Sequence, residues 1–535
     1  MSFLIHQYLD HHAHHQPHSE AVSCLDTKLS YSELQNKANQ LAHRLIALDV
    51  HPGSRVGIYM DKCIDMAVAI YGILKAGAVY VPLDPFAPAK RLGDIINDCN
   101  IHVLLSHSNK KKRLPKVILA SNKPLFIIGL ENVEQTISPQ TFESQPWQWV
   151  FDHSKNSIPE VNIIESDLAY IIYTSGTTGN PKGIMHTHHS CLSYVRWAVN
   201  EVNVQPNDRL GNHCPLHFDI SIFDWFAAAV AGASTIIIPD EYTKLPASYA
   251  QLIAQSQMTV LFTVPFALIQ LSQYGLLEEQ DMSHLRWITF AGEPMPVKHL
   301  RTIMHILPKV TFDNMYGPAE TNVVTHHKVE HVEQTATAIP IGKMCEFAQG
   351  LIVDECGHPV TKGEIGELLV RSPSMMQGYW GRPDLNKTAF YTLTEKTHFD
   401  GEFKKTFYRT GDLVKVDNKG IIWFLGRKDR QVKVRGYRVE LDEIEAILVS
   451  HDNIEEAAVY TVTIADKPVE LHATYTVKPE AKVLSSEMSK YLKSRLPSYA
   501  VPNYMTNVQA FPRTSSGKID RKELSKEASY VSNTQ

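Results

Sequence analysis

The chain alternates short, continuously apolar runs with longer segments whose apolar residues recur at helical spacing. Residues 55–60 (RVGIYM) precede the helical pattern DMAVAIYGILKAG, and LAYIIYTSG leads into HHSCLSYVRWAV. Further apolar runs of the first kind are STIIIP, MTVLFTVP, WITFAGE and KVTFDNMYG. Because such strands are typical of sheets that helices cover on both faces, the pattern predicts an α/β protein.

The pattern changes near residues 426–445 (GRKDRQVKVRGYRVELDEIE), where charged residues become dense and the expected strands become short. We assign residues 1–428 to a large N-terminal body with helix-covered sheets. The body exceeds the usual size of a single core, so we expect it to contain several subdomains. We assign residues 429–535 to a small, mobile α+β domain.

Within the small domain, VELDEIEAILVSH places Leu441, Ile444 and Leu448 on one face of an expected helix. EEAAVYTVT and LHATYTVK predict strands, and SSEMSKYLKSRLP predicts a further helix. The polar segment after Leu524 predicts a frayed end.

Composition and charge favour an enzyme of the cytoplasm. Of the 535 residues, 44% are apolar and 20% are charged, and the net charge of −5 gives no field that would recruit nucleic acid or an anionic membrane. No apolar run approaches the roughly 18 residues that span a bilayer. The N-terminus, MSFLIHQYLDHH, lacks the basic start and apolar core of a signal peptide. The 7 cysteines include no CxxC pair, which is typical of reduced thiols.

Residues 173–183 (YTSGTTGNPKG) form a glycine-rich loop directly after an expected strand. The order of residues is not that of a Walker loop, because Asn180 and Pro181 separate the last loop glycine from Lys182, and Gly183 follows in place of Ser or Thr. No G-x-G-x-x-G dinucleotide motif occurs here either. Backbone N–H groups, several hydroxyls and one mobile ammonium could still surround the β- and γ-phosphates of a nucleotide.

Six other stretches of the chain accompany this loop, each occurring once and in a fixed order. They are LSYSELQNKANQLA, LKAGAVYVPLDP, NMYGPAE, GELLVRSPSMMQGYW, YRTGDLVKVDNKGIIWFLGRKDRQVKVRGYRVELDEIE and PRTSSGKIDR. Together they resemble the adenylate-forming superfamily, and specifically the amino-acid adenylation domains of nonribosomal peptide synthetases. The resemblance covers residues 5–525.

The resemblance implies a ligase that joins a carboxylate to the α-phosphate of ATP, releases pyrophosphate, and then passes the acyl group to a thiol. Lys518 would bridge the carboxylate and the α-phosphate, Glu320 would bind Mg²⁺, and Thr174 would assist catalysis. Tyr316 would stack on adenine, and Asp412 would accept hydrogen bonds from the ribose. The residues implied around the nucleotide are Thr174, Ser175, Gly176, Thr177, Thr178, Gly179, Lys182, Gly292, Asn314, Tyr316, Gly317, Asp412, Arg427 and Lys518.

The same resemblance implies that the small domain rotates about a hinge at Asp429. In one arrangement Lys518 reaches the site, and in the other the segment 433–438 (KVRGYR) lines the path of the thiol. Such alternation is a hinge motion absorbed at few residues.

HCPLHFDISIFDW resembles the substrate-pocket stretch of the family, and Asp219 falls where a carboxylate would pair with the α-ammonium of an amino acid. The alternative is that Asp219 caps the following helix. The residues implied around the substrate are Phe218, Asp219, Ile220, Phe223, Phe262, Thr289, Ala291, Met315, Val323 and Val324. Since the walls are almost entirely apolar, we expect a compact apolar amino acid, with L-proline as first choice.

The chain has neither the HHxxxDG motif of a condensation domain nor a carrier-protein motif, so we expect a free-standing ligase that loads the phosphopantetheine arm of a separate carrier protein. The alternatives are an acyl- or aryl-CoA ligase, a D-alanine–carrier protein ligase and, from a different class, an inactive scaffold protein. We expect no nucleic-acid or membrane partner.

Overall fold

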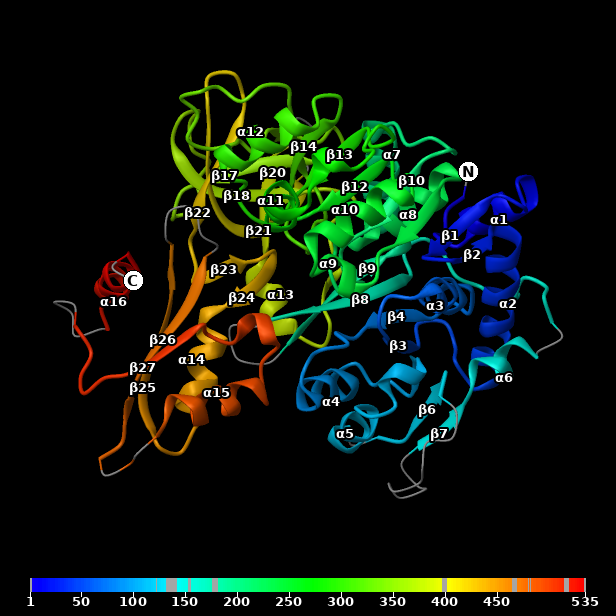
Figure 1. Ribbon diagram of the computed structural model, residues 1–535, viewed down its shortest axis with the longest axis horizontal. Coiled ribbons are helices and arrows are strands. Elements are labelled where there is room, and N and C mark those ends of the chain that lie inside the picture. The colour runs from blue at the N-terminus through cyan, green and yellow to red at the C-terminus, as the bar shows by residue number, and fades with distance from the viewer. Residues whose placement is uncertain are drawn as a thin grey trace.

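The computed structural model describes residues 2–121, 123–130, 142–152, 155–175, 181–396, 402–463, 469–479, 481, 483–513 and 519–533. A large body holds the N-terminal part of the chain, and a smaller unit at its side holds the C-terminal part (Figure 1). None of the described helices is both long enough and apolar enough to cross a membrane.

Two mixed sheets, parallel in their central strands, form the body. The first has, in spatial order, the strands β16 (Lys343–Met344), β15 (Thr325–Val329), β14 (Thr311–Tyr316), β13 (Trp287–Phe290), β12 (Val260–Thr263), β10 (Arg209–Asn212), β11 (Ser234–Ile237), β1 (Glu20–Cys24) and β2 (Thr27–Ser30). The second has β19 (Gly378–Tyr379), β9 (Lys182–Thr187), β8 (Leu168–Thr174), β4 (Val79–Pro82), β3 (Arg55–Tyr59), β5 (Val103–Ser106), β6 (Leu125–Ile128) and β7 (Phe142–Gln145). Antiparallel strands close both ends of the first sheet and one end of the second.

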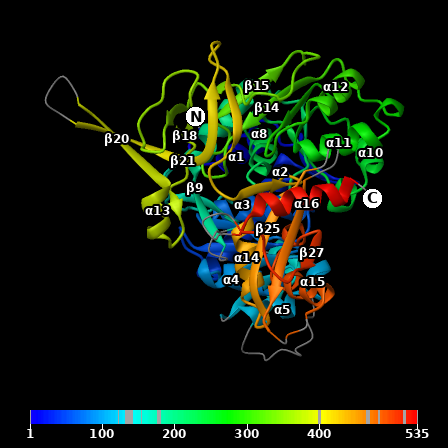
Figure 2. The same ribbon diagram turned by 90° about the vertical axis from the view of Figure 1, so that its left-hand side faces the viewer.

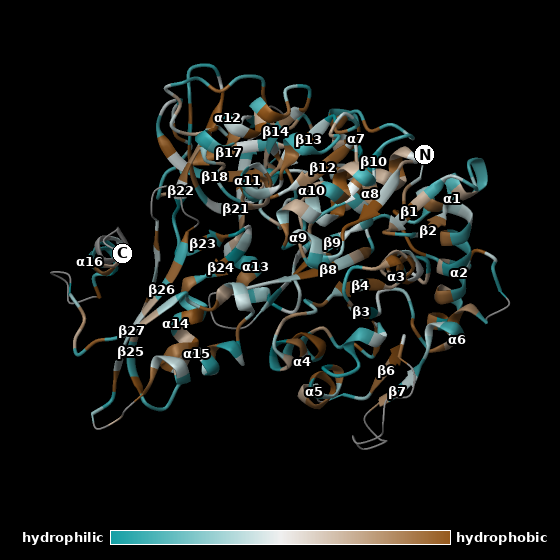
Figure 3. Ribbon diagram, in the orientation of Figure 1, coloured by the Kyte–Doolittle hydropathy of each residue, from teal (hydrophilic) through white to brown (hydrophobic). Residues whose placement is uncertain are grey.

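One core joins the facing sides of the two sheets through four helices: α2 (Tyr31–Ala47), α3 (Ile64–Lys75), α7 (His188–Val202) and α8 (Ser221–Ala231). Hydrophobic residues concentrate in α3 and α8 because these helices are buried on nearly every side (Figure 3). Two further cores cover the outer faces of the sheets, built with α10 (Pro246–Gln255), α11 (Pro265–Tyr274) and α12 (Val297–Ile306) on one, and α4 (Ala89–Asp98) and α5 (Leu114–Ala120) on the other. The remaining helices of the body are α1 (Gln7–His15), α6 (Trp147–Phe151), α9 (Asp240–Thr243), α13 (Pro383–Ala389), η1 (Ser108–Lys110) and η2 (Leu277–Glu279).

An antiparallel sheet forms a third part of the body and leads toward the small unit. Its strands are β17 (Gln349–Val353), β18 (Ile365–Arg371), β21 (Glu402–Val416), β20 (Phe390–Lys396) and β22 (Ile422–Arg427). The prediction of an α/β body with helix-covered sheets is therefore confirmed, with several cores as its length requires.

The small unit has its own core. It consists of a hairpin of β23 (Gln431–Val434) and β24 (Tyr437–Glu440), a sheet of β25 (Ile454–Val462), β26 (Glu470–Val477) and β27 (Tyr504–Asn507), and the helices α14 (Leu441–Val449), α15 (Ser485–Lys493), η3 (Ser498–Ala500) and α16 (Arg521–Asn533). Leu441, Ile444 and Leu448 are buried on one face of α14, as their spacing predicts.

The prediction of a frayed end after Leu524 was wrong. Helix α16 continues to Asn533, because Leu524 packs against Ala458 and Tyr460 of β25. The hydroxyl of Ser525 also donates to the carbonyl of Thr461. Contacts with the neighbouring strand, which composition does not reveal, hold the polar segment in helical form.

Candidate active site

The glycine-rich loop connects two antiparallel strands. β8 ends at Thr174, β9 begins at Lys182, and these two residues pair across the ladder. Gly176, Thr177, Thr178 and Gly179 lie outside the described residues. Because a strand and not a helix follows the loop, the connection differs from a Walker loop, as the residue order predicts.

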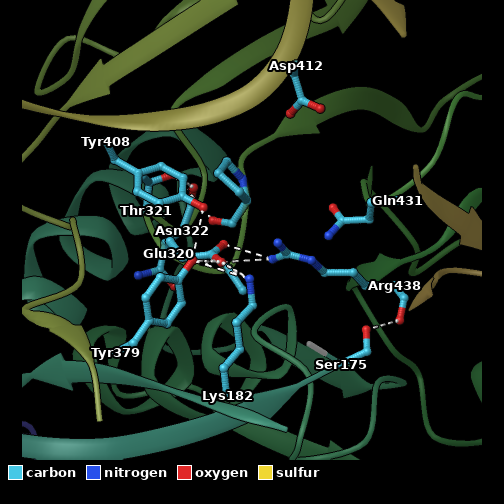
Figure 4. Close-up of polar contacts among 12 residues, drawn as sticks. Ser175, Lys182, Glu320, Thr321, Asn322, Tyr379, Tyr408, Asp412, Gln431 and Arg438 are labelled. Carbon is cyan, nitrogen blue, oxygen red and sulfur yellow. Dashed lines mark hydrogen bonds and ion pairs between the residues drawn. The ribbon is translucent and has the colours of Figure 1, made fainter. Parts of the chain in front are cut away.

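Glu320 lies at the centre of a charged cluster beside this loop (Figure 4). Its carboxylate is fully buried and accepts hydrogen bonds from Nη1 of Arg438 at 3.0 and 2.9 Å and from the hydroxyl of Tyr379 at 2.7 Å. Nζ of Lys182 lies 3.6 Å away. Burial alone would raise the pKa of Glu320, but Arg438 and Lys182 hold that pKa far below its ordinary value. The carboxylate is therefore an anion that needs cations around it.

The residues that the sequence assigns to adenine and ribose also come together. The hydroxyl of Tyr316, at the end of β14, donates to Oδ2 of Asp412 at 2.5 Å, and Nη1 of Arg427 donates to Oδ1 at 2.6 Å. Arg427 also forms a two-pronged pair with Asp429 at 2.6 and 2.7 Å. Nδ2 of Asn314 donates to the carbonyl of Pro340 at 2.8 Å. Arg427 thus links Asp412, which we expect to bind the ribose, to Asp429, which we expect to be the hinge.

Two predicted glycines are required by the backbone. Gly292 has a φ of +98°, which side chains rarely adopt. A Cβ on Gly317 would lie 1.8 Å from the carbonyl oxygen of Asn322, so any larger residue would displace that turn. Both glycines line the cavity described next.

A cavity enclosed by β8, the start of α8 and the β23–β24 hairpin brings most of the expected substrate residues together. Those that line it are Phe218, Asp219, Ile220, Phe262, Ala291 and Val323, beside Thr174, Ser175, Gly292 and Gly317 of the expected nucleotide site. Burial raises the pKa of Asp219, and Lys433 opposes this effect. Asp219 does not cap α8, because the N-cap is Ile220 and makes no side-chain cap.

Four expected substrate residues do not line this cavity. Phe223 is buried and packs edge-on against Phe262, with ring centroids 5.6 Å apart. The hydroxyl of Thr289 accepts a hydrogen bond from Nε1 of Trp287 at 3.1 Å. Met315 is buried in the central core, and Val324 faces a different core. Successive side chains of an extended segment point to opposite sides, so Val323 and Val324 cannot both face the cavity.

The small unit closes the cavity from the other side with residues whose contacts the sequence did not reveal. Lys433, Gly436 and Arg438, from the β23–β24 hairpin, line it together with Tyr499. The hydroxyl of Ser175 donates to the carbonyl of Arg438 at 3.1 Å. The only sequence signal for Lys433, Gly436 and Arg438 is their place in the KVRGYR segment, which the family resemblance assigns to the thiol path, and Tyr499 was not predicted.

Two further contacts hold this arrangement. The N–H of Gly436 donates to Oε2 of Glu293 at 3.1 Å. Arg91 of α4 forms a buried ion pair with Glu443 of α14, with 2.7 Å between Nη1 and Oε1. These contacts hold the β23–β24 hairpin against the site.

Lys518 lies outside the described residues. Helix α16, which begins at Arg521, lies at the outer edge of the small unit, far from β8 in Figure 1, and Figure 2 looks onto this side of the molecule. Arg521, its first residue, pairs with Glu445 of α14 at 2.9 Å.

A second cavity, of about 650 Å³, lies between the body and the small unit. Phe266 contributes to it from the body, and Tyr437 from the small unit. Phe218, Gly436 and Tyr499 line both cavities, so the second cavity adjoins the one that contains Asp219.

Known proteins resemble this chain in sequence and in fold. The family model described as AMP-binding enzyme matches residues 9–380, and that of the AMP-binding enzyme C-terminal domain matches residues 443–518. The chain is 31% identical to an L-proline--[L-prolyl-carrier protein] ligase of Pseudomonas fluorescens, over 98% of this chain and 99% of the relative. It is 34% identical to a ligase of the same name from Streptomyces coelicolor, over 94% of this chain and 92% of the relative. The adenylation domain AlmE of Vibrio cholerae, solved with glycyl-adenosine-5'-phosphate, shares the fold with a TM-score of 0.82 at 24% identity, over 99% of this chain and 98% of that chain.

Proposed function

The chain belongs to the AMP-binding enzyme family, and on this premise we propose that it activates a small apolar amino acid, with L-proline as first choice, as the aminoacyl-adenylate. The observation that carries the proposal is that Asp219 shares one cavity with Thr174 and Gly317 of the nucleotide motifs. A half-buried carboxylate beside apolar walls suits an α-ammonium group attached to an apolar side chain. Two relatives named as L-proline--[L-prolyl-carrier protein] ligases support the choice of proline.

ATP fits the residues around this cavity. The hydroxyl of Thr174 is buried and has no hydrogen-bond partner among the described residues, so it can donate to a phosphate oxygen. The ring of Tyr316 would lie against adenine. Asp412 would accept hydrogen bonds from the ribose while Arg427 and Tyr316 keep its oxygens in place. Lys182, at the start of β9, would face the β- and γ-phosphates.

Glu320 fits Mg²⁺, because a buried carboxylate is a hard oxygen ligand whose charge a cation must balance. When bound, Mg²⁺ would neutralise phosphate charge during attack by the substrate carboxylate. In the arrangement described here, Arg438 balances the same carboxylate.

The second cavity suits the arm of a carrier protein. We infer that a phosphopantetheine thiol enters between Phe266 of the body and Tyr437 of the small unit, and that its sulfur reaches the carbonyl carbon of the adenylate beside Asp219. The thiol loses its proton to solvent as the carbon–sulfur bond forms, the bond between the carbonyl carbon and the phosphate oxygen breaks, and AMP leaves with that oxygen and its electron pair. The arrangement with the hairpin at the site is the one we assign to this transfer.

The experiment that tests the proposal is ATP–pyrophosphate exchange with purified protein, using all common L-amino acids, D-proline, D-alanine, and representative fatty and aryl acids. We expect L-proline to give the strongest exchange. Preference for D-alanine would indicate a D-alanine–carrier ligase, and exchange with fatty or aryl acids, followed by transfer to CoA, would indicate an acyl-CoA ligase. Absence of exchange with every acid would reject an adenylating function and leave a scaffold role.

The role of Lys518 remains a prediction and is tested in the same assay. Lys518→Ala should severely reduce exchange, because a cation is needed between two approaching anions. Normal adenylate formation by this variant would reject that role.

A further inference from the structure

Three ionisable side chains meet on the sheet face that packs against α7, away from both cavities. Glu201 lies in the last turn of α7, Asp313 lies in β14, and His326 lies in β15. Each residue offers one atom that could bind a metal ion, and these three atoms all lie within 4.8 Å of one another. None of the three lines either cavity, so the function proposed above does not use them.

Asp313 is the unusual member of this group. Its side chain has no exposed surface, and neither carboxylate oxygen has a hydrogen-bond partner among the described residues. Nδ1 of His326 lies 3.6 Å from its Oδ2, beyond ordinary hydrogen-bond distance, and also 3.6 Å from Oε1 of Glu201. A fully buried carboxylate that lacks a hydrogen bond, and whose ion-pair contact with His326 depends on protonation of the imidazole, is costly, and a cation seated among these atoms would remove the cost.

Strand register fixes the side on which these groups lie. Asp313 pairs with Lys328, and Met315 pairs with His326, across the β14–β15 ladder. Directly opposed residues share a face, so Asp313, His326 and Lys328 point toward α7. The ring of Trp197 on α7 meets that of His326, with centroids 5.2 Å apart. The three candidate ligands are thus held by rigid elements.

We propose that Glu201, Asp313 and His326 bind a divalent transition-metal ion of the zinc type. An imidazole nitrogen and two carboxylates are a donor set that such ions accept, and a water molecule can complete the coordination. Lys328 now pairs with Glu201, with 2.6 Å between Nζ and Oε1. Its side chain is 44% exposed, so the ammonium can move into solvent when an ion takes its place.

An ion at this site would tie the end of α7 to β14 and β15. Because it would bind the folded chain and not the unfolded one, its expected effect is stabilisation. The site is therefore structural.

The test is titration of the metal-free full chain with Zn²⁺ in competition with a chelating dye of known affinity. We expect one equivalent whose affinity falls at least tenfold in His326→Asn and in Asp313→Asn. Asp313 is fully buried and its variant could fail to fold, so the decisive variant is His326→Asn, because the side chain of His326 is 16% exposed. Lys328→Met should bind Zn²⁺ more tightly, since the competing ammonium is gone.

Matched controls exclude other zinc sites. His327→Asn changes the neighbouring histidine, whose side chain lies on the opposite face of β15, and should leave the affinity unchanged. The described part of the chain has one other group of residues that could hold a metal ion, the exposed Asp354, Cys356 and His358. Cys356→Ser removes one potential ligand of that group. No binding by the wild type, equal affinity in His326→Asn, or loss of the equivalent in Cys356→Ser would overturn the proposal.

Discussion

The buried ion pair between Arg91 and Glu443 predicts that the two half-reactions can be separated by one substitution. Nη1 and Oε1 lie 2.7 Å apart, and the side chains are only 9% and 3% exposed. Burial raises the pKa of Glu443, and Arg91 opposes this effect. The pair joins α4 of the body to α14 of the small unit, so a rotation of the small unit about the expected hinge at Asp429 would break it.

Arg91→Met would leave the carboxylate of Glu443 buried without its cation. Breaking such a pair costs about 3–5 kcal/mol when the remaining charge stays buried. If the small unit rotates as the family resemblance implies, it would avoid this cost, because Glu443 would then reach water. Even about 3 kcal/mol corresponds to a shift of about 100-fold against the hairpin arrangement.

The assay compares pyrophosphate exchange with single-turnover transfer of the preformed adenylate to a pantetheine thiol. We expect Arg91→Met to slow the transfer by up to about two orders of magnitude and to leave exchange within a few-fold of the wild type. The effect should shrink at acid pH, where protonation of Glu443 removes the unpaired charge.

Two controls decide the cause. The double variant with Arg91→Met and Glu443→Leu removes both charges and should recover most of the transfer rate. Glu456→Gln breaks the exposed pair with Arg513 inside the small unit and should change neither half-reaction. Equal losses in exchange and transfer for Arg91→Met, or no recovery in the double variant, would refute the reasoning.

Three further predictions use the same protein. Asp219→Asn should weaken the apparent affinity for the amino acid by about 10- to 100-fold in the exchange assay, since a charge-assisted hydrogen bond contributes about 1.5–3 kcal/mol; unchanged kinetics would reject the ammonium role. Arg438→Gln should slow transfer more than exchange, because Glu320 loses its closest cation; the reverse order would contradict the assignment. Burial lowers the pKa of His186 and His188 to about 4 each, so the unfolded chain binds more protons between about pH 6.5 and 4. As pH drops through this window, the free energy of unfolding should therefore fall by up to about 1.4 kcal/mol per pH unit for each of the two histidines. A midpoint of denaturant unfolding that is equal at pH 7 and pH 5 would contradict this prediction.

The sequence predicts those features that depend on local pattern. Apolar runs locate β3, β8 and β14, and the order of residues around Lys182 correctly argued against a Walker loop, although strand β9 was not predicted. The helix that follows Asp219 was also predicted, and it begins one residue too late for Asp219 to cap it.

The contacts that create the site depend on long-range geometry that local pattern does not contain. Arg91 and Glu443 are 352 residues apart in sequence, and nothing in the flanking residues of either indicates the other. The cavity walls show the same limit, since Phe223 and Met315 belong to the expected substrate set but pack into the core behind the surface that Phe262 presents. Which apolar side chain reaches a cavity is decided by strand direction and by the volume of its neighbours.

If the small unit alternates between two arrangements as the family resemblance implies, Glu320 gives a physical reason why the two would exclude each other. Its carboxylate is fully buried, and Arg438 occupies both oxygens in the arrangement seen here. If Mg²⁺ binds the same carboxylate during adenylation, the ion and the guanidinium compete for it, because two cations at that distance repel each other. Coupling between two binding events is reciprocal. If Mg²⁺ weakens the pair of Arg438 and Glu320 by some factor, that pair weakens the binding of Mg²⁺ by the same factor. Departure of Mg²⁺ with pyrophosphate would then favour the hairpin arrangement, and thiol transfer would follow adenylation without a separate signal.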